Sequence, residues 1–135
     1  MAQIHIQIIV PNAIKLDDMV DSIFVPGCEG DFEIMYDHAP IITKLRPGTV
    51  EVNKGKEADC FAMYDGFITV EDNHVLILTE SCESKNEINL EEAIHDKEQA
   101  EKDIATVGKG NNLDYMKAQA ALMKAVARIN TAKHS

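Results

Sequence analysis

The densest run of ionisable side chains lies between Glu29 and His38 and reads Glu-Gly-Asp-Phe-Glu-Ile-Met-Tyr-Asp-His. Within it Asp37 stands next to His38, and a carboxylate beside an imidazole can perform general acid–base catalysis. Neighbouring residues of a β-strand point to opposite faces of the sheet, so on a strand these two side chains would not cooperate. We therefore expect no catalytic residue, and a small hydrolase is the least favoured interpretation.

Motifs for metal or phosphate binding are absent from the chain. It has no Walker sequence, no glycine-rich phosphate loop, no His-Glu-x-x-His and no Cys-x-x-Cys. A metal site that combines His38, His74 or His95 with a cysteine has no supporting spacing, so we expect no metal. The cysteines are odd in number and far apart, which is typical of a reduced, cytosolic protein: Cys28, Cys60 and Cys82.

The elements that must position these residues divide the chain into two parts. Ile4, Ile6 and Ile8 alternate with His5 and Gln7, which is the period of a half-buried strand, and similar patterns continue to residue 80. Turn residues interrupt this stretch at Pro11-Asn12, Pro26-Gly27, Pro47-Gly48, Lys54-Gly55 and Asp72-Asn73. Many short strands with frequent turns favour an antiparallel β-sandwich or flattened barrel, which we assign to residues 1–87.

Residues 88–135 have the period of helices. Asn89 is a suitable N-cap for a helix over residues 90–107, and Gly108 to Asn112 would end it. A second helix over residues 113–131 has an apolar seam at Tyr115, Ala118, Leu122, Ala125 and Ile129. The short connection requires the two helices to lie antiparallel if they pack together, so we expect an α-helical hairpin.

Charge is distributed unevenly over these parts. The 135 residues include 23 acidic and 13 basic side chains, for a net charge of −10. Residues 1–89 carry 16 acidic and 6 basic side chains, residues 90–107 carry 6 and 2, and residues 108–135 carry 1 and 5. The overall acidity argues against nucleic-acid binding, and no apolar run is long enough to span a membrane. The N-terminus has no features of a secretory signal or a transit peptide.

The basic residues of the second helix allow two interpretations. They are Lys117, Lys124, Arg128 and Lys133, and the first three share one helix face. In the first interpretation this face is solvated and pairs with the acidic first helix. In the second it docks on an acidic surface of a partner when the hairpin opens.

Several segments resemble the epsilon subunit of F-type ATP synthases. The resemblance is carried by Gly27-Cys28-Glu29-Gly30-Asp31-Phe32, by His38-Ala39-Pro40-Ile41-Ile42-Thr43-Lys44-Leu45-Arg46-Pro47-Gly48, by Gly66-Phe67-Ile68-Thr69-Val70, by Asn73-His74-Val75-Leu76-Ile77-Leu78, by Leu90-Glu91-Glu92-Ala93 and by Asp114-Tyr115. It extends over essentially the whole chain, and the block from His38 to Gly48 is the most specific part.

The resemblance implies a non-catalytic rotor subunit. Its β-sandwich would bind the gamma subunit and rest on the c-subunit ring, with the ring contacts at Glu29, Gly30, Asp31 and His38. Its hairpin would either fold against the sandwich or extend toward the catalytic head of alpha and beta subunits and inhibit ATP hydrolysis. In the extended state the basic residues of the second helix would face an acidic segment of a beta subunit. For His38, a purely structural role within its turn remains the alternative.

Three departures from the family pattern affect these expectations. Tyr36-Asp37 replaces a Pro-Gly pair before the His38 block, and Asp65-Gly66 replaces a Gly-Gly pair. Members that bind ATP have Ile-Asp-x-x-Arg-Ala at the start of the hairpin, where this chain has Ile88, Asn89, Glu92 and Ala93. Glu92 would repel a polyphosphate, so we expect neither tight ATP sensing nor a cofactor.

The sequence as a whole favours a central-stalk subunit that couples ion translocation to ATP synthesis. It would be peripheral on the cytoplasmic face of a bacterial inner membrane, with the stromal face of a plastid thylakoid as a weaker alternative. A β-sandwich adaptor whose hairpin recruits an unrelated protein is the second interpretation.

Overall fold

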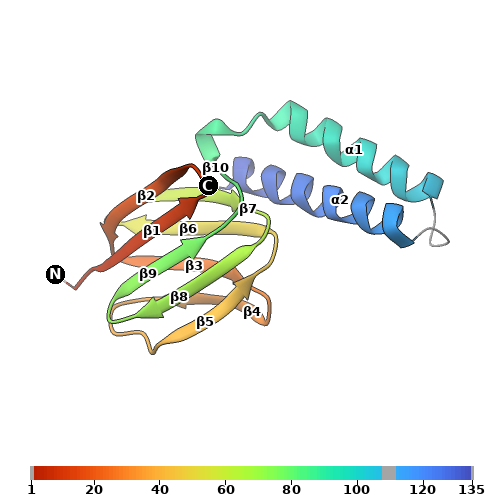
Figure 1. The fold of residues 1–135 in the computed structure, drawn as a ribbon. Coiled ribbons are helices and arrows are strands. Elements are labelled where there is room, and N and C mark those ends of the chain that lie inside the picture. The colour runs from red at the N-terminus through yellow and green to blue at the C-terminus, as the bar shows by residue number, and fades with distance from the viewer. Residues whose placement is uncertain (1, 108–111, 135) are drawn as a thin grey trace.

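The computed structural model describes residues 2–107 and 112–134, which form ten strands followed by two long helices (Figure 1). The strands are β1 (Ile4–Val10), β2 (Ala13–Val20), β3 (Ser22–Gly27), β4 (Gly30–Ile34), β5 (Ile41–Leu45), β6 (Gly48–Lys54), β7 (Glu57–Met63), β8 (Gly66–Glu71), β9 (His74–Leu78) and β10 (Cys82–Ser84). A short 3-10 turn, η1 (Lys85–Glu87), leads to α1 (Leu90–Val107) and α2 (Asn112–Lys133). The predicted fold class, a β-sandwich followed by a helical hairpin, is confirmed.

The strands form one strongly bent sheet. Their order is β10-β7-β6-β3-β5-β8-β9-β1-β2, and β4 pairs with β3 beside this path. Each pair is antiparallel except β1 with β9. The β2–β3 corner closes against β6, where the Asp21 amide donates to the Asn53 carbonyl at 2.8 Å. The sheet is therefore a nearly closed sandwich.

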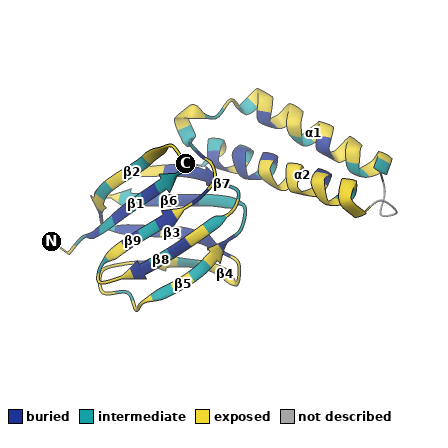
Figure 2. Ribbon diagram, in the orientation of Figure 1, coloured by how far each residue is buried: buried dark blue, intermediate teal, exposed yellow. Residues whose placement is uncertain are grey.

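The core lies between the two halves of this sheet. Ile4, Ile6 and Ile8 point inward from β1, as their alternation predicts, and Ile68 and Ile77 meet them from β8 and β9. Figure 2 shows this alternation as dark and light bands along the strands. Because residues two apart on a strand face the same side, each strand contributes every second side chain to one apolar cluster.

Two turns differ from the sequence expectation. Pro26-Gly27 is the end of strand β3 rather than a turn, and Cys28-Glu29 makes the connection to β4. Asp37 and His38 lie in the turn between β4 and β5, so the premise that they share a strand is wrong. Asp37 has a φ of 64°, and its amide donates to Asn73 Oδ1 at 2.6 Å. That contact joins residues 36 positions apart, which local sequence patterns do not reveal.

Asn89 caps α1 as predicted, because its Oδ1 accepts the Glu92 amide at 3.0 Å. The described part of α1 extends to Val107, and α2 is described from Asn112, inside the predicted break. The rest of that break, residues 108–111, lies outside the described residues.

The hairpin packs through alanines. Ala93 and Ala100 of α1 are buried, as are Ala118 and Ala125 in the predicted seam of α2. The C-terminal half of α2 lies against β6 and β7, while the other end of the hairpin points away from the sandwich (Figure 1). Because alanine buries little apolar area, this docking is weakly stabilised compared with the isoleucine core.

Gly66 is the tightest backbone position at the end of the sandwich. Its φ is +152°, and a Cβ there would lie 2.5 Å from the carbonyl oxygen of Leu78 on the adjacent strand. Gly55, in the β6–β7 turn, also has a positive φ of +61° but has open space around it. Substitution at Gly66 therefore tests a steric clash together with backbone strain, whereas substitution at Gly55 tests backbone strain alone.

We expect Gly66→Ala to lower the free energy of unfolding by about 3 kcal/mol or more, since the new methyl must displace backbone. Gly55→Ala is the matched control and should cost only about 1 kcal/mol of backbone strain. Urea unfolding of both variants measures the difference. Equal losses would show that the Leu78 carbonyl does not restrict this site.

Candidate functional site

The predicted ring-contact residues are arranged along the edge strand β4. Glu29 lies at the exposed tip before this strand, Gly30 and Asp31 begin it, and His38 follows its other end. The Asp31 carboxylate forms an ion pair with Arg46 Nη2. The structure thus places the four predicted residues on one strand and its two turns, and whether they bind a partner stays a prediction.

Gly30 is a conformational requirement within this chain. Its φ is +137°, but a Cβ would meet nothing within 4 Å, so the requirement is conformational and not the close approach of a neighbour within this chain. The crowded glycine is Gly27, where a Cβ would lie 2.6 Å from the Gly30 carbonyl oxygen.

His38 and Asp37 use different partners. His38 Nδ1 lies 2.7 Å from the Ala39 carbonyl oxygen, and its ring lies 6.2 Å from that of Phe32. The Asp37 carboxylate accepts a hydrogen bond from Asn73 Nδ2 at 3.1 Å. His38 is therefore bonded within its turn, and this geometry gives no support to a catalytic pair.

An exposed apolar surface on β5, β8 and β9 was missed by the sequence analysis. Ile42 is 77% exposed, Phe67 50% and Leu78 46%, and all three side chains point away from the core. Phe67 pairs directly with Lys44 on one side and Leu78 on the other. We call Ile42, Phe67 and Leu78 the outer apolar face. The signal was present in the consecutive apolar pairs Ile41-Ile42, Phe67-Ile68 and Ile77-Leu78, which make both sides of these strands apolar.

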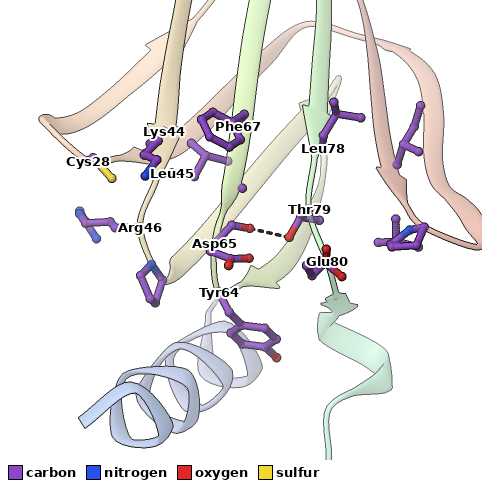
Figure 3. A pocket seen from close by; sticks show the side chains of 15 residues that line it. Cys28, Lys44, Leu45, Arg46, Tyr64, Asp65, Phe67, Leu78, Thr79 and Glu80 are labelled. Carbon is purple, nitrogen blue, oxygen red and sulfur yellow. Dashed lines mark hydrogen bonds between the residues drawn. The ribbon is translucent and has the colours of Figure 1, made fainter. Parts of the chain in front are cut away.

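A hollow of about 740 Å³ opens where these strands end, and Phe67 and Leu78 form part of its wall (Figure 3). Lys44 lies beside Phe67, with Nζ 5.7 Å from the ring centre. Thr79 Oγ1 donates to the Asp65 carbonyl at 2.5 Å, which joins the ends of the neighbouring strands β8 and β9 beside the hollow. An apolar surface with a hollow and a charged edge has the composition of a protein-binding site.

The second notable group of charges surrounds Arg128. This side chain is only 7% exposed, and three carboxylates converge on it. Its Nε lies 2.8 Å from Glu83 Oε1, its Nη2 lies 3.2 Å from Glu92 Oε1, and its Nη1 lies 3.3 Å from Asp96 Oδ2. We call Arg128 with these three residues the arginine clamp. Because Glu83 is on β10 and the other two acids are on α1, the clamp joins both helices to the sandwich.

The protonation states of the arginine clamp follow from its surroundings. Burial alone would lower the pKa of Arg128, but hydrogen bonding and attraction to Glu83, with a further contribution from Glu92, raise it overall. Tyr64 donates its hydroxyl to Glu83 Oε1 at 2.6 Å, and burial together with this bond raises the pKa of Tyr64. The guanidinium is therefore charged and the phenol neutral at physiological pH.

The predicted basic face of α2 is divided in this conformation. Lys117 and Lys133 are exposed, and Lys124 Nζ lies 4.8 Å from the centre of the Tyr64 ring. Arg128 is buried and engaged, so it is not part of a solvated surface here. Helix periodicity predicts that Arg128 and Lys124 share one side of α2. It does not predict that acidic residues of α1 and β10 surround Arg128.

The C-terminal end of α2 adds polar contacts to the sandwich. Thr131 Oγ1 lies 2.8 Å from Thr49 Oγ1 on β6. His134 Nε2 lies 3.2 Å from Glu51 Oε2, and its Nδ1 lies 3.4 Å from the sulfur of Cys60. Lys85 Nζ donates to the His134 carbonyl. The chain end is thus bound to β6, β7 and η1.

The positions compared with an ATP-binding motif have structural partners in this chain. Asn89 uses its side chain as the α1 cap, Glu92 is paired with Arg128, and Ala93 is fully buried on α1. Ile88 is half-buried in the connection to α1. Whether this region binds a nucleotide stays untested.

The three histidines considered for metal binding lie on separate elements: His38 in the β4–β5 turn, His74 on β9 and His95 on α1. Among residues 2–107 and 112–134, no group of three His, Cys, Asp or Glu side chains is placed to hold a metal ion. The same part of the chain contains no helix that is long and apolar enough to cross a membrane.

Comparison with known proteins assigns the family. Residues 3–85 match the family described as "ATP synthase, Delta/Epsilon chain, beta-sandwich domain", and residues 86–133 match its long alpha-helix domain. The ATP synthase epsilon chain of Syntrophobacter fumaroxidans is 34% identical over 131 residues, which are 97% of this chain and 96% of that protein. The epsilon chain of Moorella thermoacetica is 34% identical over 133 residues, which are 98% of each.

Solved structures show the same fold. A chain in the cryo-EM structure of Euglena gracilis mitochondrial ATP synthase (OSCP/F1/c-ring) superposes with a TM-score of 0.86 at 23% identity, covering 99% of this chain and 83% of that one. Both domains of the family are therefore present in order and at nearly full length. The chain belongs to the delta/epsilon chain family of ATP synthases, with bacterial epsilon chains among its relatives.

Proposed function

We propose that this protein is a non-catalytic rotor subunit that connects the gamma subunit to the c-subunit ring and restrains ATP hydrolysis through its hairpin. The observation that carries the proposal is the outer apolar face, which lies on the sandwich that the family shares. Its site of action would be the cytoplasmic side of a bacterial inner membrane, bound through other subunits. The reaction itself would take place on the alpha and beta subunits.

The outer apolar face suits the gamma subunit as its partner. Three large apolar side chains stay exposed on neighbouring strands, and Glu71 and His74 bound them on the strands β8 and β9. Burial of such a centre provides most of the affinity of a protein interface, and its polar rim provides orientation. The adjacent hollow would accept a side chain of gamma.

The acidic end of β4 suits the c ring. Glu29 and Asp31 are exposed beside Gly30, and a glycine without neighbours leaves the backbone open to close approach from outside the chain. Polar loops of the ring subunits would meet this end through hydrogen bonds and ion pairs. His38 holds the turn at the other end of the strand through the Ala39 carbonyl.

The hairpin suits a regulatory role because it can leave the sandwich without opening the core. Arg128 and Thr131 contact the sandwich through polar groups, and no described residue of α1 or α2 belongs to the isoleucine cluster, which lies within the sandwich. Its exposed lysines would meet an acidic segment of a beta subunit once it extends.

We expect Ile42→Asp to weaken binding to the isolated gamma subunit by at least about tenfold, since it places an unpaired carboxylate at the centre of the interface. Leu113→Asp is the matched control, because Leu113 is also an apolar residue that is mostly exposed, at the far end of the hairpin. Titration calorimetry with gamma gives both affinities. Unchanged binding by Ile42→Asp, with normal folding, would remove the outer apolar face from the gamma interface.

We expect Lys117→Glu with Lys133→Glu to raise the concentration needed for half-maximal inhibition of ATP hydrolysis by about fivefold or more, since opposite charges guide docking. The assay uses the catalytic head depleted of its epsilon subunit. Lys56→Glu with Lys102→Glu is the control, because it makes the same charge change away from α2. If both double variants inhibited like the native chain, the basic face would have no part in inhibition.

A further inference from the structure

We propose that Glu83, Glu92 and Asp96 form an internal acidic receptor that binds Arg128 and so holds the hairpin closed. The consequence for inhibition rests on the proposed function: an acidic surface on a partner would have to compete with this receptor before it could use Arg128. The arginine clamp would then be an autoinhibitory contact within an inhibitory subunit.

The geometry of the clamp supports a lock rather than an incidental surface pair. Glu83 contacts the guanidinium at two points, since Nη2 donates to Oε2 at 3.3 Å and Nε lies 2.8 Å from Oε1 as an ion pair without hydrogen-bond geometry. Arg128 is more than nine-tenths buried, and Glu83 is the least exposed of its three partners, whereas the side chains of Glu92 and Asp96 stay 58% and 51% exposed. A buried charge that loses its partners is strongly destabilising, which ties the docked position of α2 to the acids of β10 and α1.

The receptor contains more negative charge than Arg128 neutralises. The cleft between α1, α2 and β10 has a volume of about 420 Å³ and contains four carboxylates against two cations. These ionisable side chains are Glu83, Glu92, Asp96, Asp103, Lys124 and Arg128. The receptor thus has the chemistry expected of any outside surface that would bind the same arginine.

Because the cleft has more carboxylates than cations, two carboxylates can be removed without leaving Arg128 unpaired, and the receptor can be tested in a folded chain. Glu92→Gln with Asp96→Asn removes two of the three carboxylates but leaves Glu83, which keeps its bonds to Arg128 and Tyr64. The matched control is Glu98→Gln with Glu101→Gln. Both control residues are exposed on the same helix, outside the cleft, and the change in net charge is identical.

Cys60 is a native reporter of the docked hairpin. It is 5% exposed, outside the apolar cluster of the sandwich, and in contact with His134 at the end of α2. Cys82 belongs to that cluster, so it reports global unfolding instead. Burial raises the pKa of the Cys60 thiol, and it raises the pKa of Cys82 to about 11, so both are unreactive in the closed state.

The experiment measures the reaction of a disulfide reagent with the full chain carrying Cys28→Ser, which removes the exposed thiol. In the Glu92→Gln, Asp96→Asn variant we expect Cys60 to react at least about tenfold faster while Cys82 stays protected, because the open fraction rises. The control variant should react at the native rate. A native rate in both variants would overturn the proposal, as would simultaneous exposure of Cys60 and Cys82, which would mean unfolding rather than opening.

A second arm separates this proposal from the proposed function. The same variants are titrated into the catalytic head depleted of its epsilon subunit, and ATP hydrolysis is measured. Faster Cys60 reaction together with inhibition at lower concentration supports both. Faster Cys60 reaction without any inhibition supports the clamp and contradicts the inhibitory role of the hairpin.

Discussion

One buried guanidinium connects the hairpin to the sandwich. Arg128 is enclosed by acids from β10 and α1, so a single side chain of α2 joins all three elements. A long-range charge pair in water is weak, but the same pair is strong where solvent is excluded. Docking of α2 withdraws Arg128 from water, although the side chains of Glu92 and Asp96 stay 58% and 51% exposed, and the pair with Glu83 in turn favours docking. The two effects are mutually dependent, which is the physical basis of a two-state element.

The two parts of the chain are stabilised by different means. The sandwich has its own cluster of large aliphatic side chains, closed by a sheet that bends round on itself. The hairpin relies on alanine packing, helix capping by Asn89 and the polar contacts of Arg128, Thr131 and His134. A sandwich with its own core and a helical arm that contributes nothing to that core suit the proposed coupling subunit with a regulatory role. The uneven charge of the sequence has a structural meaning here, since the acidic helix and the basic helix face one another across the cleft.

Much of the fold was accessible from the sequence because its signals are local. The alternation of Ile4, Ile6 and Ile8 identified a half-buried strand, and Asn89 marked the start of α1. The burial of Arg128 could not be predicted from the sequence. One face of α2 packs on α1 and another on the sandwich, and periodicity does not show whether a residue between these faces is buried or exposed. The turn at Asp37 was misassigned for a similar reason, since its partner Asn73 is distant in sequence. The outer apolar face could have been recognised from pairs of consecutive apolar residues. A search for alternating residues assigns one of each pair to the core and disregards the other, which lies on the outer side of the strand.

The central claim, that this chain is a rotor subunit of an ATP synthase, is tested most directly by recovering it with its partners. The full chain with an affinity tag would be expressed in its own organism, membranes solubilised in mild detergent, and the bound proteins identified by mass spectrometry. We expect gamma, alpha, beta and c subunits to be recovered together in one complex. Recovery of the tagged chain without gamma, from membranes in which the catalytic head remains intact, would contradict it.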